Sequence, residues 1–135
     1  MMISLIGYGG SNPTDFFARI QKLNPDLIVD VRADPYHAYL ATYTKPQLER
    51  RLKDKYIWIP ELGNKTRDIN HIQLVDEEKG LEKLSELLKR YERIVLLCAE
   101  KNDEDCHRSY VKSRFLKRFP RRWLSLLLFR PAGSS

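Results

Sequence analysis

The 135-residue sequence is poor in cysteine, with only two, and it has no long apolar run and no basic stretch ahead of its short apolar N-terminal segment. A membrane-spanning helix needs roughly 18 or more consecutive apolar residues, so we expect none and no contact with a membrane. The segment MMISLIGYGG also lacks the basic region that opens a signal peptide, so we expect no export signal. Two cysteines without an export signal favour a cytoplasmic location with free thiols, although a Cys98–Cys106 disulfide is the alternative.

Several motifs that define common protein classes are also missing. The sequence has no CxxC pair, no GxGxxG or P-loop, and no RNP, zinc-finger or helix-turn-helix pattern. It also has no internal repeat, linker or low-complexity tract. A chain of this length without such features suits one domain, which we place at residues 1–130, followed by a disordered tail at residues 131–135.

The net charge of +6 comes from one part of the chain. From Lys112 onward there are seven basic residues and no acidic one, whereas residues 1–111 carry 17 basic and 18 acidic residues. A basic helix of this kind can bind nucleic acid. A solvated helix face is the commoner explanation, and no recognised nucleic-acid motif accompanies these residues.

Apolar patterning predicts an alternation of strands and helices. Period-3.6 patterns indicate helices that begin after Asn12, after Thr44 and before Leu81, and a basic helix that ends at Pro120. Short apolar runs indicate five strands, at Ile3–Ile6, Leu27–Val31, Tyr56–Ile59, Ile94–Cys98 and Trp123–Phe129. This order predicts an α/β fold: a single Rossmann-like domain with a mainly parallel sheet of about five strands and helices on both faces.

The stretch RIVLLCAEKNDEDCHRS, residues 93–109, is the most informative. It predicts a buried strand that ends at Cys98 and an acidic loop that begins at Glu100. A helix follows, and its first turn contains Cys106, His107 and Arg108. Such a turn offers unpaired N–H groups and a positive dipole end to an anion, and an arginine adds a planar fork of donors. A thiol there loses its proton more easily than a free cysteine, whose pKa is about 8.5. The alternative is that Cys98 is a small core residue.

Two further strand ends carry candidate ligand-binding residues. Gly7, Tyr8 and Gly9 follow the first strand, where they form either a tight turn or a ligand-binding loop. Asp30 and Arg32 end the second strand on the same side of it, and they either contact a ligand or pair with each other. Because parallel strands end at the same edge of a sheet, we expect these residues and Cys98 to share one pocket.

Two loops could shape that pocket. Residues 33–43 contain three tyrosines and His37, which either stack on a ligand ring or pack onto the domain. Residues 60–76 show no clear periodicity, and we expect a long structureless lid that includes Lys65, Arg67 and His71.

Four segments together resemble the DUF488 family of small α/β proteins over nearly the whole chain. They are IGYGG at Ile6–Gly10, DVRADP at Asp30–Pro35, PELG at Pro60–Gly63 and LLCAEKNDEDCHRS at Leu96–Ser109. The sequence departs from the family at His37, where a serine is common, and at Asn64, where a second glycine is common. The resemblance implies a Rossmann-like domain and marks six positions for attention: Arg32, Cys98, Glu100, Cys106, His107 and Arg108.

Three functions are consistent with these residues. The first is binding of an anionic, phosphate-bearing ligand such as a nucleotide at the strand ends, by Arg32 and Arg108, with Cys98 or Cys106 as nucleophile and His107 or Glu100 moving protons. No CxxxxR loop of rhodaneses or tyrosine phosphatases follows Cys98, so the reaction, and whether the protein is an enzyme, stay open. The second is a nucleic-acid-binding module that uses the basic helix.

The third function is a metal site of Cys98, Cys106 and His107 with Glu100 nearby. Neighbouring residues on a helix point about 100 degrees apart, which disfavours joint ligation by Cys106 and His107. We therefore expect no metal and no cofactor, and the sequence leaves the oligomeric state open.

Overall fold

The computed structural model describes residues 2–68, 70–99 and 107–120 and contains a parallel four-stranded sheet. The strands are β1 (Met2–Gly7), β2 (Leu27–Asp30), β3 (Tyr56–Trp58) and β4 (Arg93–Cys98). Their order across the sheet is β1-β4-β2-β3, and every pairing is parallel. The α/β prediction is confirmed. Four strands are described where about five were expected, and the predicted strand at Trp123–Phe129 lies outside the described residues, as does the predicted tail.

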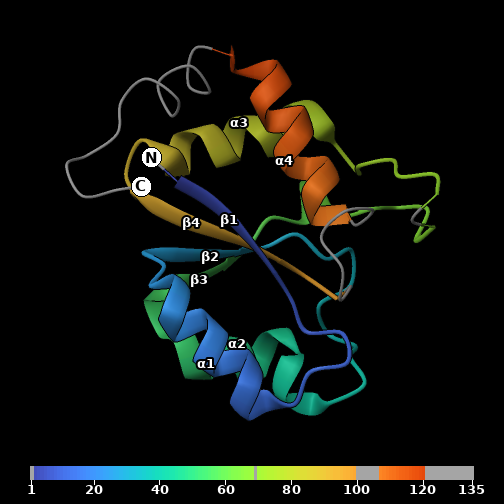
Figure 1. Cartoon of the computed structure of the whole chain (residues 1–135). Coiled ribbons are helices and arrows are strands. Elements are labelled where there is room, and N and C mark those ends of the chain that lie inside the picture. Colours follow the sequence, from blue (N-terminus) through green and yellow to red (C-terminus); the bar gives the residue numbers. More distant parts are fainter. Residues whose placement is uncertain (1, 69, 100–106, 121–135) are drawn as a thin grey trace.

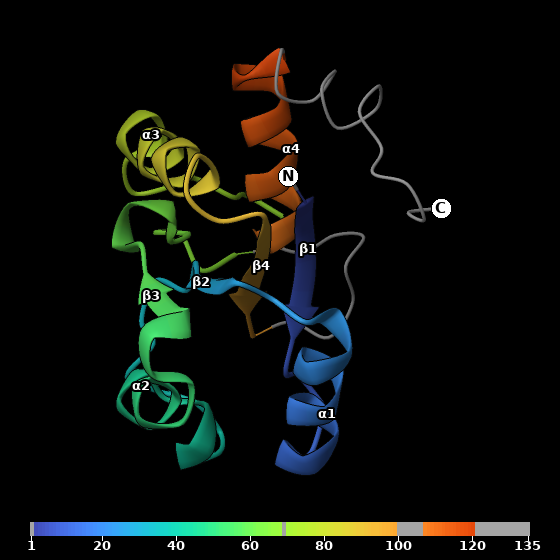
Figure 2. The same cartoon turned by 90° about the vertical axis from the view of Figure 1, so that its left-hand side faces the viewer.

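Helices cover both faces of the sheet, as predicted. They are α1 (Pro13–Leu23), α2 (Lys45–Leu52), α3 (Glu77–Leu88) and α4 (His107–Arg118). The first two lie on one face, and α3 and α4 lie on the other (Figures 1 and 2). Three short 3-10 helices connect these elements, at Ala41–Tyr43, Lys53–Lys55 and Pro60–Leu62. No helix in the described part of the chain is long and apolar enough to cross a membrane.

Strand β4 lies between β1 and β2 and contributes to the core on both faces. Successive side chains of a strand point to opposite faces. Leu96 and Cys98 therefore pack with Val111 and Phe115 of α4, whereas Leu97 packs with Phe16 of α1 on the other face. Because β4 is buried on both faces, its sequence is a continuous apolar run rather than an alternating one.

Side-chain caps define where two of the helices begin. The side chain of Asn12 accepts a hydrogen bond from the backbone N–H of Asp15 at 2.9 Å, which confirms the predicted start of α1. The third helix begins before Leu81, as predicted. Asp76 accepts from the backbone N–H of Lys79 at 3.2 Å, so α3 begins at Glu77.

The segment from Pro60 to Asp76 is not the structureless loop that its lack of periodicity suggested. A 3-10 turn opens it, and Asn64 pairs with Leu74 in an antiparallel bridge. The Asn64 side chain accepts from the backbone N–H groups of Thr66 and Gln73 and donates to the carbonyl of Asp68. Asn64 is buried, so one side chain holds the loop in a defined shape.

Candidate functional site

The carboxyl ends of the strands open into one pocket of about 630 Å³. Tyr8 follows β1, Arg32 follows β2, and Cys98 ends β4. The remaining lining residues come from the loops after β2, β3 and β4 and from the start of α4: Ala33, Asp34, His37, Asn64, Arg67, Asp68, Ala99 and His107. The expectation that Tyr8, Arg32 and Cys98 share one edge of the sheet is thus met by the geometry.

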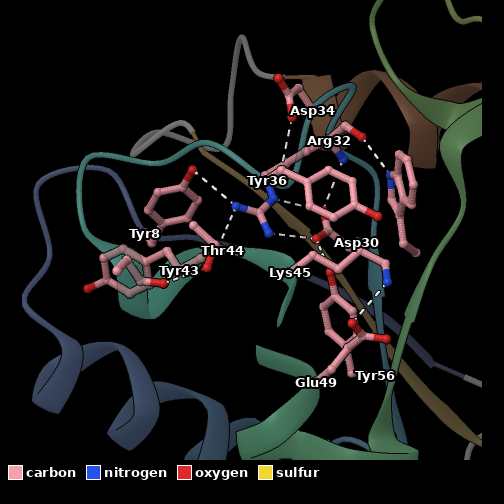
Figure 3. Close-up of polar contacts among 12 residues, drawn as sticks. Tyr8, Asp30, Arg32, Asp34, Tyr36, Tyr43, Thr44, Lys45, Glu49 and Tyr56 are labelled. Atoms are coloured by element: carbon pink, nitrogen blue, oxygen red, sulfur yellow. Dashed lines mark hydrogen bonds and ion pairs between the residues drawn. The ribbon is translucent and has the colours of Figure 1, made fainter. Parts of the chain in front are cut away.

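Asp30 and Arg32 form a buried ion pair at the end of β2 (Figure 3). Nε of Arg32 donates to Oδ1 of Asp30 at 2.9 Å, and Nη2 donates to Oδ2 at 2.7 Å. The carboxylate is fully buried and the arginine is 5% exposed. The sequence left two interpretations of these residues, contact with a ligand or pairing with each other. The structure shows that they pair with each other, and Arg32 also lines the pocket.

Three tyrosines also form hydrogen bonds with this pair. Nη1 of Arg32 donates to the backbone carbonyl of Tyr43 at 2.6 Å and to the hydroxyl oxygen of Tyr8 at 3.3 Å. The hydroxyl of Tyr56 donates to Oδ2 of Asp30. Burial alone would lower the pKa of the Arg32 guanidinium. The hydrogen bonds to Asp30 and the negative charge of Asp30 together have a larger effect and raise this pKa. Burial, together with the Asp30 charge, raises the pKa of Tyr56.

The tyrosines of the loop after β2 pack onto the domain rather than standing apart. The ring of Tyr43 is buried, and its centroid lies 4.5 Å from that of Tyr8. Tyr39 stacks on Tyr8 at 5.9 Å and donates its hydroxyl to the carbonyl of Ser11 at 2.5 Å. Tyr36 is 52% exposed and meets the ring of Trp58 edge-on. The packing interpretation therefore holds for Tyr43, whereas Tyr39 and Tyr36 contact the domain but stay 59% and 52% exposed.

Cys98 and Arg108 meet where β4 and α4 come together. Nη1 of Arg108 donates a hydrogen bond to Sγ of Cys98 at 2.8 Å. Arg108 is fully buried and Cys98 is 1% exposed, yet the cysteine lines the pocket. A guanidinium that donates to a sulfur favours the thiolate over the thiol, because it stabilises the negative charge.

His107 lies beside them in the first turn of α4 and also lines the pocket. It is 4% exposed, and its Nε2 bonds to the backbone carbonyl of Leu62. A carbonyl oxygen can only accept, so Nε2 carries a hydrogen. This contact ties α4 to the 3-10 turn after β3 and fixes the imidazole ring at the pocket wall.

Charged residues of both signs stand at the mouth of the pocket. Asp34 lies 2.7 Å from Nδ1 of His37 and 3.7 Å from Nη2 of Arg67. The hydrogen bond from His37 is the main reason that the pKa of Asp34 lies below its usual value. Arg67 is 71% exposed, so its side chain can move toward a ligand. Sequence patterning placed Arg67 in the loop but gave no role to Asp34, Asn64 or Asp68.

Other predicted site residues take different positions. Gly7 ends β1, and its carbonyl accepts from Arg19 at 2.9 Å; neither it nor Gly9 is among the described residues that line the pocket. Asp30 and Arg108 lie behind the lining, in contact with Arg32 and Cys98. Cys98 is a reduced cysteine in the structure, as expected, and not part of a disulfide. Glu100 and Cys106 lie outside the described residues, so their roles and the metal-site hypothesis stay predictions. Within residues 2–68, 70–99 and 107–120, no group of three metal-ligating side chains occurs.

One basic residue of the basic helix, α4, pairs with an acidic residue of α3. Arg114 of α4 forms a two-pronged hydrogen bond with Glu77 of α3, at 3.1 and 2.7 Å. This pairing raises the pKa of Arg114. Lys117 and Arg118 are exposed. Arg121, Arg122 and Arg130 lie outside the described residues, so nucleic-acid binding by this helix stays a prediction.

The fold and the pocket define a small parallel α/β protein whose candidate site is built from the carboxyl ends of its strands. The family model described as a domain of unknown function, DUF488, matches residues 12–115, so the chain belongs to the DUF488 family. Neither the curated proteins nor the solved structures include a match.

Proposed function

We propose that the protein binds a small anionic ligand in the pocket at the strand ends and that Cys98 is the nucleophile there. The observation that carries this proposal is the contact from Arg108 Nη1 to Cys98 Sγ, 2.8 Å long, at a pocket wall. The thiolate is the reactive form of cysteine, and an adjacent guanidinium stabilises it.

Three features support an anionic ligand. The first turn of α4 supplies the positive end of a helix dipole beside His107. Arg67 is an exposed cation at the pocket mouth, and Arg32 lies in the wall. Asp34 and Asp68 add negative charge to the same lining, so the ligand has to avoid them and approach the Cys98 side.

The pocket, rather than the basic helix, is the better-supported site. A bidentate pair with Glu77 already occupies the guanidinium of Arg114. Pocket binding uses side chains from four parts of the chain that the fold brings together. Such convergence is characteristic of ligand sites in open α/β sheets.

Protection from alkylation tests the proposal. Trypsin separates the two cysteines into the peptides 94–101 and 102–108, so mass spectrometry measures iodoacetamide labelling of Cys98 alone. We expect Cys98 to react below about pH 8, where an ordinary thiol is mostly protonated. We expect added inorganic phosphate to slow the reaction with saturation, compared with sodium chloride at equal ionic strength. Absence of labelling below that pH, or equal rates in both salts, would contradict the proposal.

A further inference from the structure

The hydroxyl of Tyr8 is held rigidly at the pocket wall. Tyr8 follows β1, is 3% exposed and lines the pocket. Its ring packs against those of Tyr43 at 4.5 Å and Phe16 at 6.4 Å. Its hydroxyl oxygen accepts a hydrogen bond from Nη1 of Arg32 at 3.3 Å. The ring and its oxygen are therefore fixed before any ligand arrives.

The hydrogen of this hydroxyl has no acceptor among the described residues. A tyrosine hydroxyl has one hydrogen to donate and lone pairs that accept. Arg32 bonds to a lone pair, and none of the hydrogen bonds within residues 2–68, 70–99 and 107–120 has the Tyr8 hydroxyl as donor. A buried donor that leaves water needs an acceptor, and the pocket is the space beside it.

Arg32, by contrast, has little donor capacity left for a ligand. A guanidinium has five N–H groups. Arg32 makes four side-chain hydrogen bonds: two to Asp30, one to the carbonyl of Tyr43 and one to Tyr8. In Figure 3 the guanidinium lies between Tyr8 and Asp30, with bonds running to both sides. Arg32 lines the pocket itself, and it also donates to the Tyr8 hydroxyl at the pocket wall.

We propose that Tyr8 donates its hydroxyl hydrogen to an anionic oxygen of the ligand, and that Arg32, fixed by Asp30, positions and polarises this hydroxyl. The inference rests on the proposed function and narrows it. The ligand carries a terminal carboxylate or phosphate oxygen on the β1 side of the pocket, and its reacting atom faces Cys98. Arg32 is then a positioning residue rather than the direct ligand of the anion.

The ionisation of Tyr8 suits this role. Burial raises the pKa of Tyr8 above its usual value, although the hydrogen bond from Arg32 acts in the opposite direction. The hydroxyl therefore keeps its proton throughout the neutral range. It acts as a donor, which an anionic oxygen requires.

Two alkylating reagents that differ only in charge test the inference. Iodoacetate and iodoacetamide share a reactive carbon, but iodoacetate carries a carboxylate where iodoacetamide carries an amide. We measure the ratio of their rates at Cys98, normalised to the same ratio for N-acetylcysteine. We expect Tyr8→Phe to lower this ratio about tenfold, the usual effect of losing one hydrogen bond to a charged group.

Tyr43→Phe is the matched control, because Tyr43 belongs to the same ring cluster and its hydroxyl donates to the carbonyl of Ser11 instead. We expect its ratio to equal that of the wild type. An unchanged ratio in Tyr8→Phe, with both reagents modifying Cys98, overturns the inference and leaves the proposed function standing. If neither reagent modifies Cys98 in the wild type, the proposed function and the inference both fall.

Discussion

Arg32 turns back onto Asp30, two residues earlier, and pairs with its carboxylate through two parallel hydrogen bonds of 2.9 and 2.7 Å. The backbone N–H of Arg32 also donates to Oδ1 of Asp30, at 3.1 Å. One carboxylate thus fixes both the side chain and the backbone where β2 ends. The pair sets the direction of the next loop, which supplies Ala33, Asp34 and His37 to the pocket.

Removing the charge of Asp30 should destabilise the fold strongly. Asp30→Asn leaves the buried Arg32 guanidinium without its counterion, and breaking one side of a buried ion pair costs about 3–5 kcal/mol. Urea unfolding measures the free energy of unfolding. Asp54→Asn makes the same chemical change at an exposed position and should have almost no effect. Equal effects of the two substitutions would contradict the structural role of the pair.

Adding a methyl group at Gly63 should also be costly. A Cβ at this position would lie 2.7 Å from the Cα of Ala33, which is backbone and cannot rotate away. The φ angle is −67°, so the cost is steric and not conformational. We expect Gly63→Ala to lose about 1–3 kcal/mol in urea unfolding, as overpacked sites do.

Gly80→Ala is a useful comparison for that substitution. Its Cβ would meet the side chain of Leu62 at 2.6 Å, and a helix gains about 1 kcal/mol when glycine becomes alanine. We therefore expect Gly80→Ala to cost less than Gly63→Ala. The opposite order would show that the Gly63–Ala33 approach is looser than the structure indicates.

The contact between Lys83 and Glu61 should contribute stability that depends on pH. Nζ of Lys83 donates to Oε2 of Glu61 at 2.6 Å, and this hydrogen bond lowers the pKa of Glu61 below its usual value. A lowered carboxyl pKa stabilises the fold above the unfolded pKa, about 4.3, and the contribution disappears as the pH falls through the lowered value.

We expect Lys83→Met to lose up to about 1 kcal/mol at pH 7, because the pair is partly exposed, and to match the wild type in strong acid. Urea unfolding at both pH values checks this. Lys89→Met, which removes a more exposed pair at the C-terminal end of the same helix, is the control and should lose less at pH 7. A loss by Lys83→Met that is the same at both pH values would contradict the pairing.

The buried tyrosines predict loss of stability in alkali. Burial is the main cause that raises the pKa of Tyr43 to about 12, and it also raises the pKa of Tyr56. A raised folded-state pKa stabilises the protein below the unfolded value, about 10, and the contribution declines as the pH rises above it. Stability measured by urea unfolding should therefore fall above about pH 10. Tyr56→Phe should make this fall less steep, and an unchanged slope would contradict a buried, protonated Tyr56.

Patterning predicted the framework of the fold because each strand buries apolar residues in a short run. β4 is the clearest case, since both of its faces pack against helices, and the sequence RIVLLC reflects this directly. Asn12 followed by Pro13 located the start of α1. The apolar positions from Leu81 onward located α3 but did not define its first residue, Glu77, because the first turn is acidic and solvated.

The pocket was predicted less completely than the strands. Tyr8, Arg32 and Cys98 could be grouped because parallel strands end at one edge, a rule that depends only on topology. Asn64 and Asp68 could not be placed, because the loop that carries them is shaped by side-chain to backbone hydrogen bonds that leave no periodicity. Tyr56 was recognised as part of a strand, but its bond to Asp30 depends on the neighbouring register of β2 and β3.

The pH dependence of Cys98 alkylation tests the central claim most directly, because that claim is that Arg108 stabilises the Cys98 thiolate. For each variant, we take the rate with iodoacetamide near pH 7 relative to the same variant's rate in alkali, which cancels differences in access to the pocket. We predict a ratio about tenfold lower in Arg108→Gln than in the wild type, equivalent to one unit of pKa, with Arg108→Lys in between. Equal ratios in all three proteins would contradict the claim.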